Sequence, residues 1–288
     1  MARAEIIDDA LLRSRPLPIP EGGSKDERGA VLIVAGSPGM PGAAILAGEA
    51  ALRAGAGKLQ IGTCASVAAH VGAAVLEALV IALPETSTGA IATDGASAIR
   101  EHAKRARALV LGPGTQDQAA TAALARTVIS GLTTPVVIDA AALECAEPAA
   151  FADTAQAVLT PHAGEMASLL RLPRETIEAD PQRYACETAA HLGVVVALKG
   201  EDTFIAAPDG ACFLNTAGDI GLATSGSGDV LAGIIGGLLA RGCTPLDAAI
   251  WGVALHARAG AVLGKRIGMG FLAREIATEV PARMRALS

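Results

Sequence analysis

Residues 31–42 have the sequence VLIVAGSPGMPG, in which four consecutive apolar residues lead into a segment rich in glycine and proline. A short, continuous apolar run with such boundaries is typical of a strand buried on both faces of a sheet. The residues from Ile45 through Leu52 then show helical spacing. This stretch therefore predicts a strand, a tight loop and a helix in succession.

The same order recurs further along the chain. Four more apolar runs have this character: Leu109-Val110-Leu111, Val136-Val137-Ile138, Val158-Leu159 and Val194-Val195-Val196-Ala197-Leu198. Alanine-rich segments with helical spacing lie between them, for example from Asp117 to Ile129. Strands that alternate with helices predict an α/β fold with a mostly parallel central sheet and helices on both faces.

The pattern changes near residue 203. Two short apolar runs, 203–205 and 212–214, flank Pro208-Asp209-Gly210, which predicts an antiparallel hairpin at one edge of the sheet. Two helices should follow, one with an apolar stripe from Leu231 to Leu239 and one from Pro245 to about residue 263. No linker divides the chain, so we expect an N-terminal arm, residues 1–24, and a single catalytic domain, residues 25–288.

Composition limits the classes of partner. Apolar residues make up 51% of the 288 residues, aromatic residues only 2%, and the net charge is −6. An acidic chain without a lysine cluster is not expected to bind nucleic acid. The five cysteines are scattered without a CxxC pair, which suits a reducing compartment. The N-terminus lacks a signal-peptide pattern, and residues 59–76 are a poor membrane span, so we expect a cytoplasmic protein with no membrane partner.

Chemically active residues follow the predicted strands. In an open parallel sheet, ligands bind beyond the carboxyl ends of the strands. The five strands of this sequence are followed by segments that carry glycine, proline or an active side chain, namely 36–42, 112–115, 139–140, 160–165 and 199–203. One edge of the sheet should therefore gather these segments into a single site.

The segment Ala223-Thr224-Ser225-Gly226-Ser227-Gly228-Asp229 opens the striped helix. Small residues let a ligand approach the backbone closely, and the first amides of a helix form a site for a phosphate or a phosphoryl group. Asp229 at this position could accept the proton of an attacking hydroxyl. The alternative is an acid favoured there only by the helix dipole. The chain contains neither a P-loop motif nor the dinucleotide GxGxxG spacing.

Three other residues are candidates with simpler alternatives. His162 and Glu165 would share one face of a helix, where Glu165 could hold a metal-bound water, although an acid at a helix start is also common. Lys199 ends the most apolar strand and could either reach a phosphate or extend to solvent at the sheet edge. Asn215, the only asparagine, is expected to cap a turn. The remaining histidines, His70, His102, His191 and His256, are interpreted as surface or packing residues.

Taken in order, these motifs resemble the NAD(P)H-hydrate dehydratase family, relatives of the ribokinase-like kinases. The resemblance covers about residues 25–281 and includes Gly42-Ala43-Ala44, Ala51-Leu52-Arg53-Ala54-Gly55-Ala56-Gly57, Gly112-Pro113-Gly114, Thr160-Pro161-His162-Ala163-Gly164-Glu165, Lys199-Gly200 and Gly226-Ser227-Gly228-Asp229-Val230-Leu231-Ala232-Gly233. It implies a ribokinase-like three-layer sandwich. Each motif is weak alone, but their combination in this order is specific.

The resemblance also implies a repair reaction. Hydrated NADH or NADPH, in its S form, is phosphorylated on the ring hydroxyl by ADP or ATP with Mg²⁺, and loss of phosphate restores the reduced ring. It assigns Asp229 as the base that activates the hydroxyl. The resemblance implies that Lys199, Gly200, Glu201, Asp202 and Thr203 contact the nucleotide, together with an anion hole formed by Gly226, Ser227 and Gly228. Contacts to the substrate would come from Ala43, Gly114, His162 and Asp229. Glu165 would be a metal ligand. A homotetramer and a separate epimerase are the implied partners.

The sequence departs from the family pattern at a few positions. Ser227 and Ala163 replace the usual threonine and proline, position 141 is alanine where an acid is common, and Asp219 replaces an asparagine. Two other functions remain open from the residues. A ribokinase-like small-molecule kinase for a sugar or vitamin precursor would use the same aspartate but release a stable phosphate ester. A non-catalytic nucleotide-binding regulator would not need Asp229.

Overall fold

A computed structural model describes residues 3–19, 24–151 and 156–287 of the chain. Its centre is a 10-stranded sheet in the order β1-β10-β9-β8-β7-β6-β5-β2-β3-β4. The strands are β1 (Glu5–Ile6), β2 (Ala30–Val34), β3 (Lys58–Cys64), β4 (Ala78–Leu83), β5 (Ala108–Leu111), β6 (Val136–Ile138), β7 (Ala157–Leu159), β8 (Val195–Leu198), β9 (Thr203–Ala206) and β10 (Cys212–Asn215). All neighbouring pairs are parallel except β8 with β9 and β9 with β10. The expectation of a mostly parallel sheet is confirmed.

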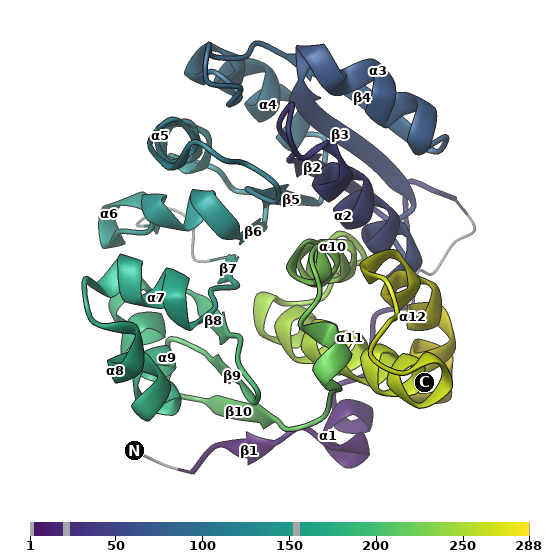
Figure 1. Cartoon of the computed structure of the whole chain (residues 1–288), viewed down its shortest axis with the longest axis vertical. Coiled ribbons are helices and arrows are strands. Elements are labelled where there is room, and N and C mark those ends of the chain that lie inside the picture. Colours follow the sequence, from purple (N-terminus) through teal and green to yellow (C-terminus); the bar gives the residue numbers. More distant parts are fainter. Residues whose placement is uncertain (1–2, 20–23, 152–155, 288) are drawn as a thin grey trace.

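Helices cover both faces of the sheet, which makes a three-layer sandwich (Figure 1). One face is covered by α2 (Pro41–Arg53), α10 (Ser227–Ala240), α11 (Pro245–Ile267) and α12 (Ala273–Leu287). Across the sheet lie α4 (Ala96–Ala103), α5 (Gln118–Ile129), α6 (Pro148–Phe151), α7 (Ala163–Leu170), α8 (Arg174–Ala179) and α9 (Pro181–Leu192). The remaining helical elements are α1 (Asp9–Ser14), α3 (Ala65–Ala74) and the short turns η1 (Thr93–Gly95), η2 (Ala140–Cys145) and η3 (Ile220–Leu222). Two apolar cores, one on each face of the sheet, hold the layers together.

The edge of the sheet differs from the expectation. The hairpin of β9 and β10 forms, but it is not the outermost element, because β1 pairs with β10 in parallel register. Strand β1 and helix α1 belong to the segment predicted as an arm, and Trp251 on α11 donates a hydrogen bond to the Arg15 main-chain oxygen at 2.7 Å. The boundary between arm and domain stays a prediction. Residues 5–6 nevertheless take part in the sheet.

Three strands, β1, β3 and β4, and several helices have no counterpart in the sequence prediction. Strand β3 was missed because Lys58, Gln60 and Thr63 interrupt its apolar pattern, and β4 is a half-exposed edge strand. Residues 59–76, expected to be a poor membrane span, are divided between β3 and α3. Helix α11 has the length and composition to cross a membrane, but 67% of its apolar window is buried inside the protein. It therefore packs as a core helix.

Helix α10 is placed against α2 by its glycines. A Cβ atom at Gly233 would collide with the main-chain oxygen of Ala47, and one at Gly237 with that of Ala51. Only glycine lets the two helices approach this closely. Because α10 begins at Ser227, beyond the sheet edge where the strands end, this contact determines where its N-terminus lies.

Candidate active site

The site lies at the carboxyl edge of the sheet, near its topological switch point. The chain passes from β2 to β3 and β4 and then returns to place β5 on the other side of β2. The loops after β2 and β5 meet there, and Gly36 N–H donates to the Pro113 main-chain oxygen at 2.8 Å. Ligands of open α/β sheets bind at such a point. Two of the predicted substrate contacts, Ala43 and Gly114, are in direct contact here, since a Cβ at Gly114 would collide with the Ala43 side chain.

Glycine is required at two turns of this edge. Gly114 has φ +68° and Gly226, directly before α10, has φ +88°, a region of backbone conformation that other residues rarely adopt. Ala140 also has a positive φ, 51°, directly after Asp139. A strained alanine at a strand end is typical of functional sites. The buried hydroxyls of Ser37 and Thr63, near Gly36, have no hydrogen-bond partner among the described residues, and a bound ligand or water could satisfy them.

The N-terminus of α10 offers free hydrogen-bond donors. Ser227 N–H is used in a turn, where it donates to the Thr224 main-chain oxygen at 3.2 Å. Within the described residues, Gly228 N–H and Asp229 N–H have no acceptor, and no side chain caps the helix. Gly228 lies close to a cation, because a Cβ at this position would be 3.5 Å from Lys199 Nζ. The first turn of α10 thus combines two free amides with one ammonium group. Of the three residues predicted to form the anion hole, Gly226, Ser227 and Gly228, the amide of Ser227 is used in the turn.

Lys199 is held by acids from the neighbouring strands. Its Nζ donates to Asp139 Oδ1 at 3.0 Å and lies 3.8 Å from Glu165 Oε2. Thr160 Oγ1 donates to the same Asp139 oxygen at 2.7 Å, which fixes the carboxylate. Burial acts to lower the pKa of Lys199, but Asp139, Glu165 and Asp229 outweigh it and raise that pKa. The lysine is therefore a fixed positive charge below the first turn of α10.

Asp229 lies in the first turn of α10 and is half-buried. No described residue donates a hydrogen bond to its carboxylate. Burial raises the pKa of Asp229 to about 7, with a further increase from the negative charge of Asp139 and a partial offset from Lys199. A carboxylate with a pKa near 7 is suited to take a proton from a hydroxyl at physiological pH.

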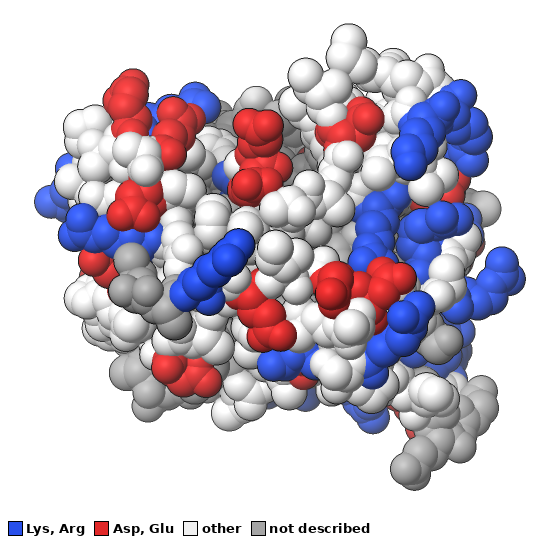
Figure 2. Space-filling view, turned by 90° about the horizontal axis from the view of Figure 1, so that it is seen from below, with Lys and Arg blue, Asp and Glu red and all other residues white. Residues whose placement is uncertain are grey.

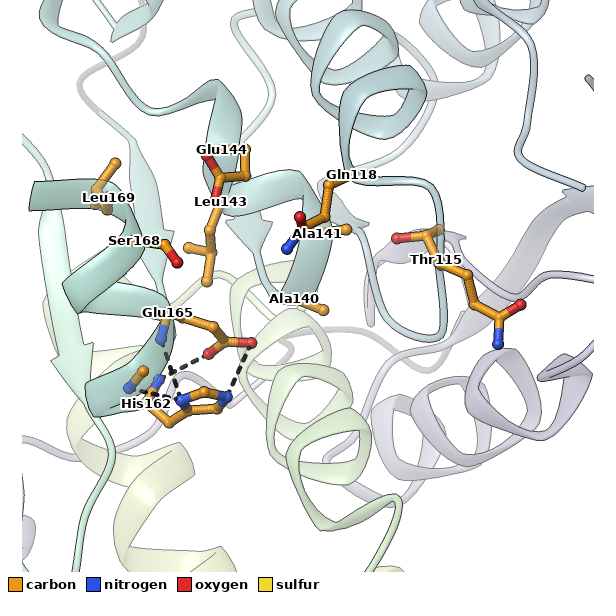
Figure 3. A pocket seen from close by; sticks show the side chains of 12 residues that line it. Thr115, Gln118, Ala140, Ala141, Leu143, Glu144, His162, Glu165, Ser168 and Leu169 are labelled. Atoms are coloured by element: carbon orange, nitrogen blue, oxygen red, sulfur yellow. Dashed lines mark hydrogen bonds and ion pairs between the residues drawn. The ribbon is translucent and has the colours of Figure 1, made fainter. Parts of the chain in front are cut away.

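His162 and Glu165 form a capping box at the start of α7. His162 Nδ1 accepts hydrogen bonds from Gly164 N–H at 3.0 Å and Glu165 N–H at 3.2 Å, while Glu165 Oε2 accepts from His162 N–H at 2.7 Å. Because Nδ1 only accepts, the neutral ring carries its proton on Nε2, which lies 3.6 Å from Glu165 Oε1. Figure 3 shows the ring and the carboxylate side by side at one end of a pocket.

That pocket has a volume of ≈ 320 Å³, and the segment after β6 forms part of its wall. Its walls carry the acids Glu144 and Glu165 and no lysine or arginine: Thr115, Gln116, Gln118, Ala140, Ala141, Leu143, Glu144, His162, Gly164, Glu165, Ser168 and Leu169. The molecular surface in Figure 2, by contrast, mixes both signs of charge, with basic side chains mainly toward one side of that face.

A larger cavity of ≈ 1000 Å³ lies on the other side of His162, which lines both. It contains the predicted nucleotide segment, from Lys199 to Thr203, together with Ser227 and Gly228 of α10. Residues 215–220 and His256 also line it. Asn215 ends β10 and donates through Nδ2 to the Ala217 main-chain oxygen at 2.8 Å, so the expected turn-capping role is confirmed.

Sequence reasoning missed two residues of this site. Asp139 was noted only as a strand-end residue, although it organises Lys199 and influences the pKa of Asp229. His256 was interpreted as an ordinary histidine, yet its Nε2 lies 3.0 Å from Ser227 Oγ. Only the position of Asp139 after a buried strand could have indicated a role. His256 carries no local signal, because it lies on a helix far along the chain.

Comparison with known proteins gives a consistent result. The family model described as NAD(P)H-hydrate dehydratase matches residues 31–282. The ADP-dependent (S)-NAD(P)H-hydrate dehydratase of Xanthomonas campestris pv. campestris is 50% identical over 281 residues, which are 97% of this chain and 96% of that protein. The bifunctional NAD(P)H-hydrate repair enzyme Nnr of Moorella thermoacetica is 39% identical over 83% of this chain, which spans 46% of that longer protein.

Solved structures agree with the sequence relatives. The ADP/ATP-dependent NAD(P)H-hydrate dehydratase from Bacillus subtilis, co-crystallized with ATP/Mg²⁺, superposes with a TM-score of 0.86 at 30% identity and full coverage of both chains. A ribokinase-like superfamily protein from Enterococcus faecalis superposes with a TM-score of 0.81 at 26% identity, covering 99% of this chain and 96% of that one. The ribokinase-like fold implied by the sequence motifs is thereby confirmed.

Proposed function

This chain belongs to the NAD(P)H-hydrate dehydratase family, and from that premise we propose how its own residues restore NADH and NADPH from their S hydrates. The reaction is that of a hydro-lyase that consumes a nucleotide phosphate. The observation that carries the proposal is the first turn of α10, where Asp229 with a pKa of about 7 lies beside two free amides and Lys199.

Phosphoryl transfer would be the first step. Asp229 takes the proton of the ring hydroxyl as its oxygen attacks the terminal phosphorus, and the bond from that phosphorus to the nucleotide breaks. Gly228 N–H and Asp229 N–H, with Lys199, stabilise the charge on the transferring group. These donors are already in place before the reaction, so little reorganisation is needed.

Elimination would complete the reaction. The bond between the ring carbon and the phosphate oxygen breaks, phosphate leaves with the electron pair, and the neighbouring ring carbon gives its proton to the departing phosphate. The double bond of the reduced nicotinamide is restored. The donors at the start of α10 stabilise the leaving phosphate as they stabilised the transferring group.

The larger cavity is proposed as the site of ADP or ATP. This proposal is supported by the lining of the cavity, which joins Lys199, Gly200, Glu201, Asp202 and Thr203 to Ser227 and Gly228. We place the hydrated dinucleotide along Ala43, Gly114 and His162, so that its ring hydroxyl reaches Asp229. Gly226 completes the loop that leads into α10.

Magnesium would be held together with the nucleotide. Among the described residues no group of three or more acids, histidines or cysteines forms a metal cage. Mg²⁺ usually keeps several waters and is held by one or two carboxylates plus substrate phosphates. Glu165, whose Oε1 is not used by the capping box, fits such a role. The ion would neutralise phosphate charge when bound.

The proposal also covers assembly and location. We expect the protein to form a homotetramer in the cytoplasm, because the family resemblance implies this assembly. We also expect a separate epimerase to supply the S hydrate, on the same ground. The five cysteines form no disulfide among the described residues, which fits a reducing compartment. Light scattering coupled to size-exclusion chromatography measures the mass of the assembly.

The direct test is an activity assay. Purified protein is incubated with hydrated NADH, Mg²⁺ and either ADP or ATP, and recovery of the near-ultraviolet absorbance of reduced nicotinamide is recorded. We expect recovery with at least one nucleotide and none without it. A folded protein that binds ADP but restores no absorbance would contradict the proposal. Accumulation of a stable phosphate ester would instead favour a small-molecule kinase.

A further inference from the structure

Ser227, the first residue of α10, is contacted by His256 of α11. His256 Nε2 lies 3.0 Å from Ser227 Oγ and 3.1 Å from the Ser227 main-chain oxygen. Both residues line the larger cavity. The reaction described above makes no use of this imidazole, although it touches the residue that begins the phosphate site.

The two contacts determine which ring nitrogen carries the proton. A main-chain oxygen can only accept a hydrogen bond, so Nε2 must be protonated. The same N–H is also directed at Ser227 Oγ, so the hydrogen bond is bifurcated and both Ser227 oxygens accept it. The hydroxyl proton therefore cannot be donated to His256 and is left for another acceptor.

The hydroxyl is the one donor that Ser227 can offer a ligand. Its amide is used in the turn to Thr224, and the residue is only 6% exposed, so its side chain has little freedom. Burial lowers the pKa of His256 to about 4, with a partial offset from the hydrogen bond to Ser227 and a small further decrease from Lys199. The imidazole is thus neutral at physiological pH and keeps its donor role.

We propose that His256 is a positioning residue that holds the Ser227 hydroxyl so that its proton is donated to the phosphoryl group in the larger cavity. The hydroxyl becomes a third donor beside the amides of Gly228 and Asp229. The proposal rests on the proposed function, since it concerns the same phosphate site. It assigns His256 no contact with substrate.

Four variants separate this role from a purely structural one. His256→Leu removes the donor, whereas His256→Gln keeps an N–H close to the position of Nε2. Ser227→Ala removes the hydroxyl, whereas Ser227→Thr retains it. His191→Gln, at an exposed position of α9, is the matched histidine control. For each, kcat at saturating ADP and hydrated NADH, the Kd of ADP by calorimetry and the Tm are measured.

We expect His256→Leu and Ser227→Ala each to lower kcat about 10²- to 10³-fold, as loss of one preorganised donor does. The double variant should be no slower than the slower single variant, because both changes remove the same donor. His256→Gln and Ser227→Thr should retain most of the rate, and His191→Gln all of it.

Three results would overturn the proposal. They are multiplicative losses in the double variant, a wild-type rate for Ser227→Ala, and a His256→Gln variant as slow as His256→Leu. If His256→Leu does not fold, the rates of Ser227→Ala, Ser227→Thr and His256→Gln still test the proposal. Failure of the proposed function is distinguishable, because it appears as an inactive wild-type protein, and the Kd of ADP then tests the hydroxyl without turnover.

Discussion

The carboxyl end of β6 and the N-terminus of α10 each present one acid to the same cluster, and the two acids have opposite surroundings. Asp139 is 3% exposed and accepts hydrogen bonds from Thr160 and Lys199. Asp229 is half-buried, and none of the described side chains or amides donates to its carboxylate. A paired acid is a fixed charge, whereas an unpaired one in a partly buried site can exchange its proton near neutral pH. The difference assigns Asp139 to organisation and Asp229 to proton transfer.

The largest effect should come from Asp229→Asn. We expect kcat to fall about 10²- to 10⁴-fold, because the proton acceptor is lost while the shape is retained. Tm at pH 8 should rise by about 2–4 °C, since the change removes a partly buried charge. Steady-state kinetics and calorimetry measure the two quantities.

The matched control is Asp247→Asn, at the third residue of α11, the position that Asp229 occupies in α10. Asp247 is paired with Arg15 at 2.7 Å, so its loss should lower Tm and leave kcat unchanged. A near-normal rate for Asp229→Asn would show that Asp229 is not the base.

The second effect concerns pH. A base with a pKa of about 7 is active when deprotonated, so kcat/KM should fall as pH decreases through that value. Asp139→Asn removes a negative charge that raises the pKa of Asp229, and the acid limb should therefore move down by about half to one pH unit. The profile is measured from pH 5.5 to 9, about the range in which such a base titrates.

Thr134→Ser, a conservative change of a buried hydroxyl that bonds Ala103 on the far face of the sheet, is the control for altered packing. Its profile should match that of the wild type. An acid limb that stays in place in Asp139→Asn would contradict the electrostatic coupling between the two acids.

The smallest effect should come from Gly228→Ala, which adds a methyl group close to Lys199 and Asp139. The added Cβ would be 3.5 Å from Lys199 Nζ and 4.0 Å from Asp139 Oδ2, which are ordinary contact distances. We expect a few-fold increase in KM for ADP, because the methyl group narrows the approach of phosphate to Lys199. Gly72→Ala on α3, with a Cβ 3.6 Å from Val80, is the control for helix propensity. An unchanged KM would place phosphate away from this contact.

Much of the fold could be predicted because its information is local. Apolar runs without alternation indicated β2, β5, β6, β7 and β8, and the stripe from Leu231 to Leu239 indicated α10. Strands β3 and β4 escaped because one is interrupted by polar residues and the other lies half-exposed at the sheet edge. Strand β1 has only two residues, so its pairing with β10 has no signal in the sequence.

The sequence by itself determined the order of the elements, the glycine turns at the strand ends and the position of Asp229 in the first turn of a helix. The pairs that adjust the site were decided by tertiary structure. Lys199 and Asp139 are 60 residues apart and Ser227 and His256 are 29 apart, so no local pattern joins them. Parallel strands bring Lys199 to Asp139, and the packing of α10 on α11 brings His256 to Ser227. Burial of Asp229 in the folded chain and the negative charge of Asp139 raise the pKa of Asp229 to about 7, with a partial offset from Lys199.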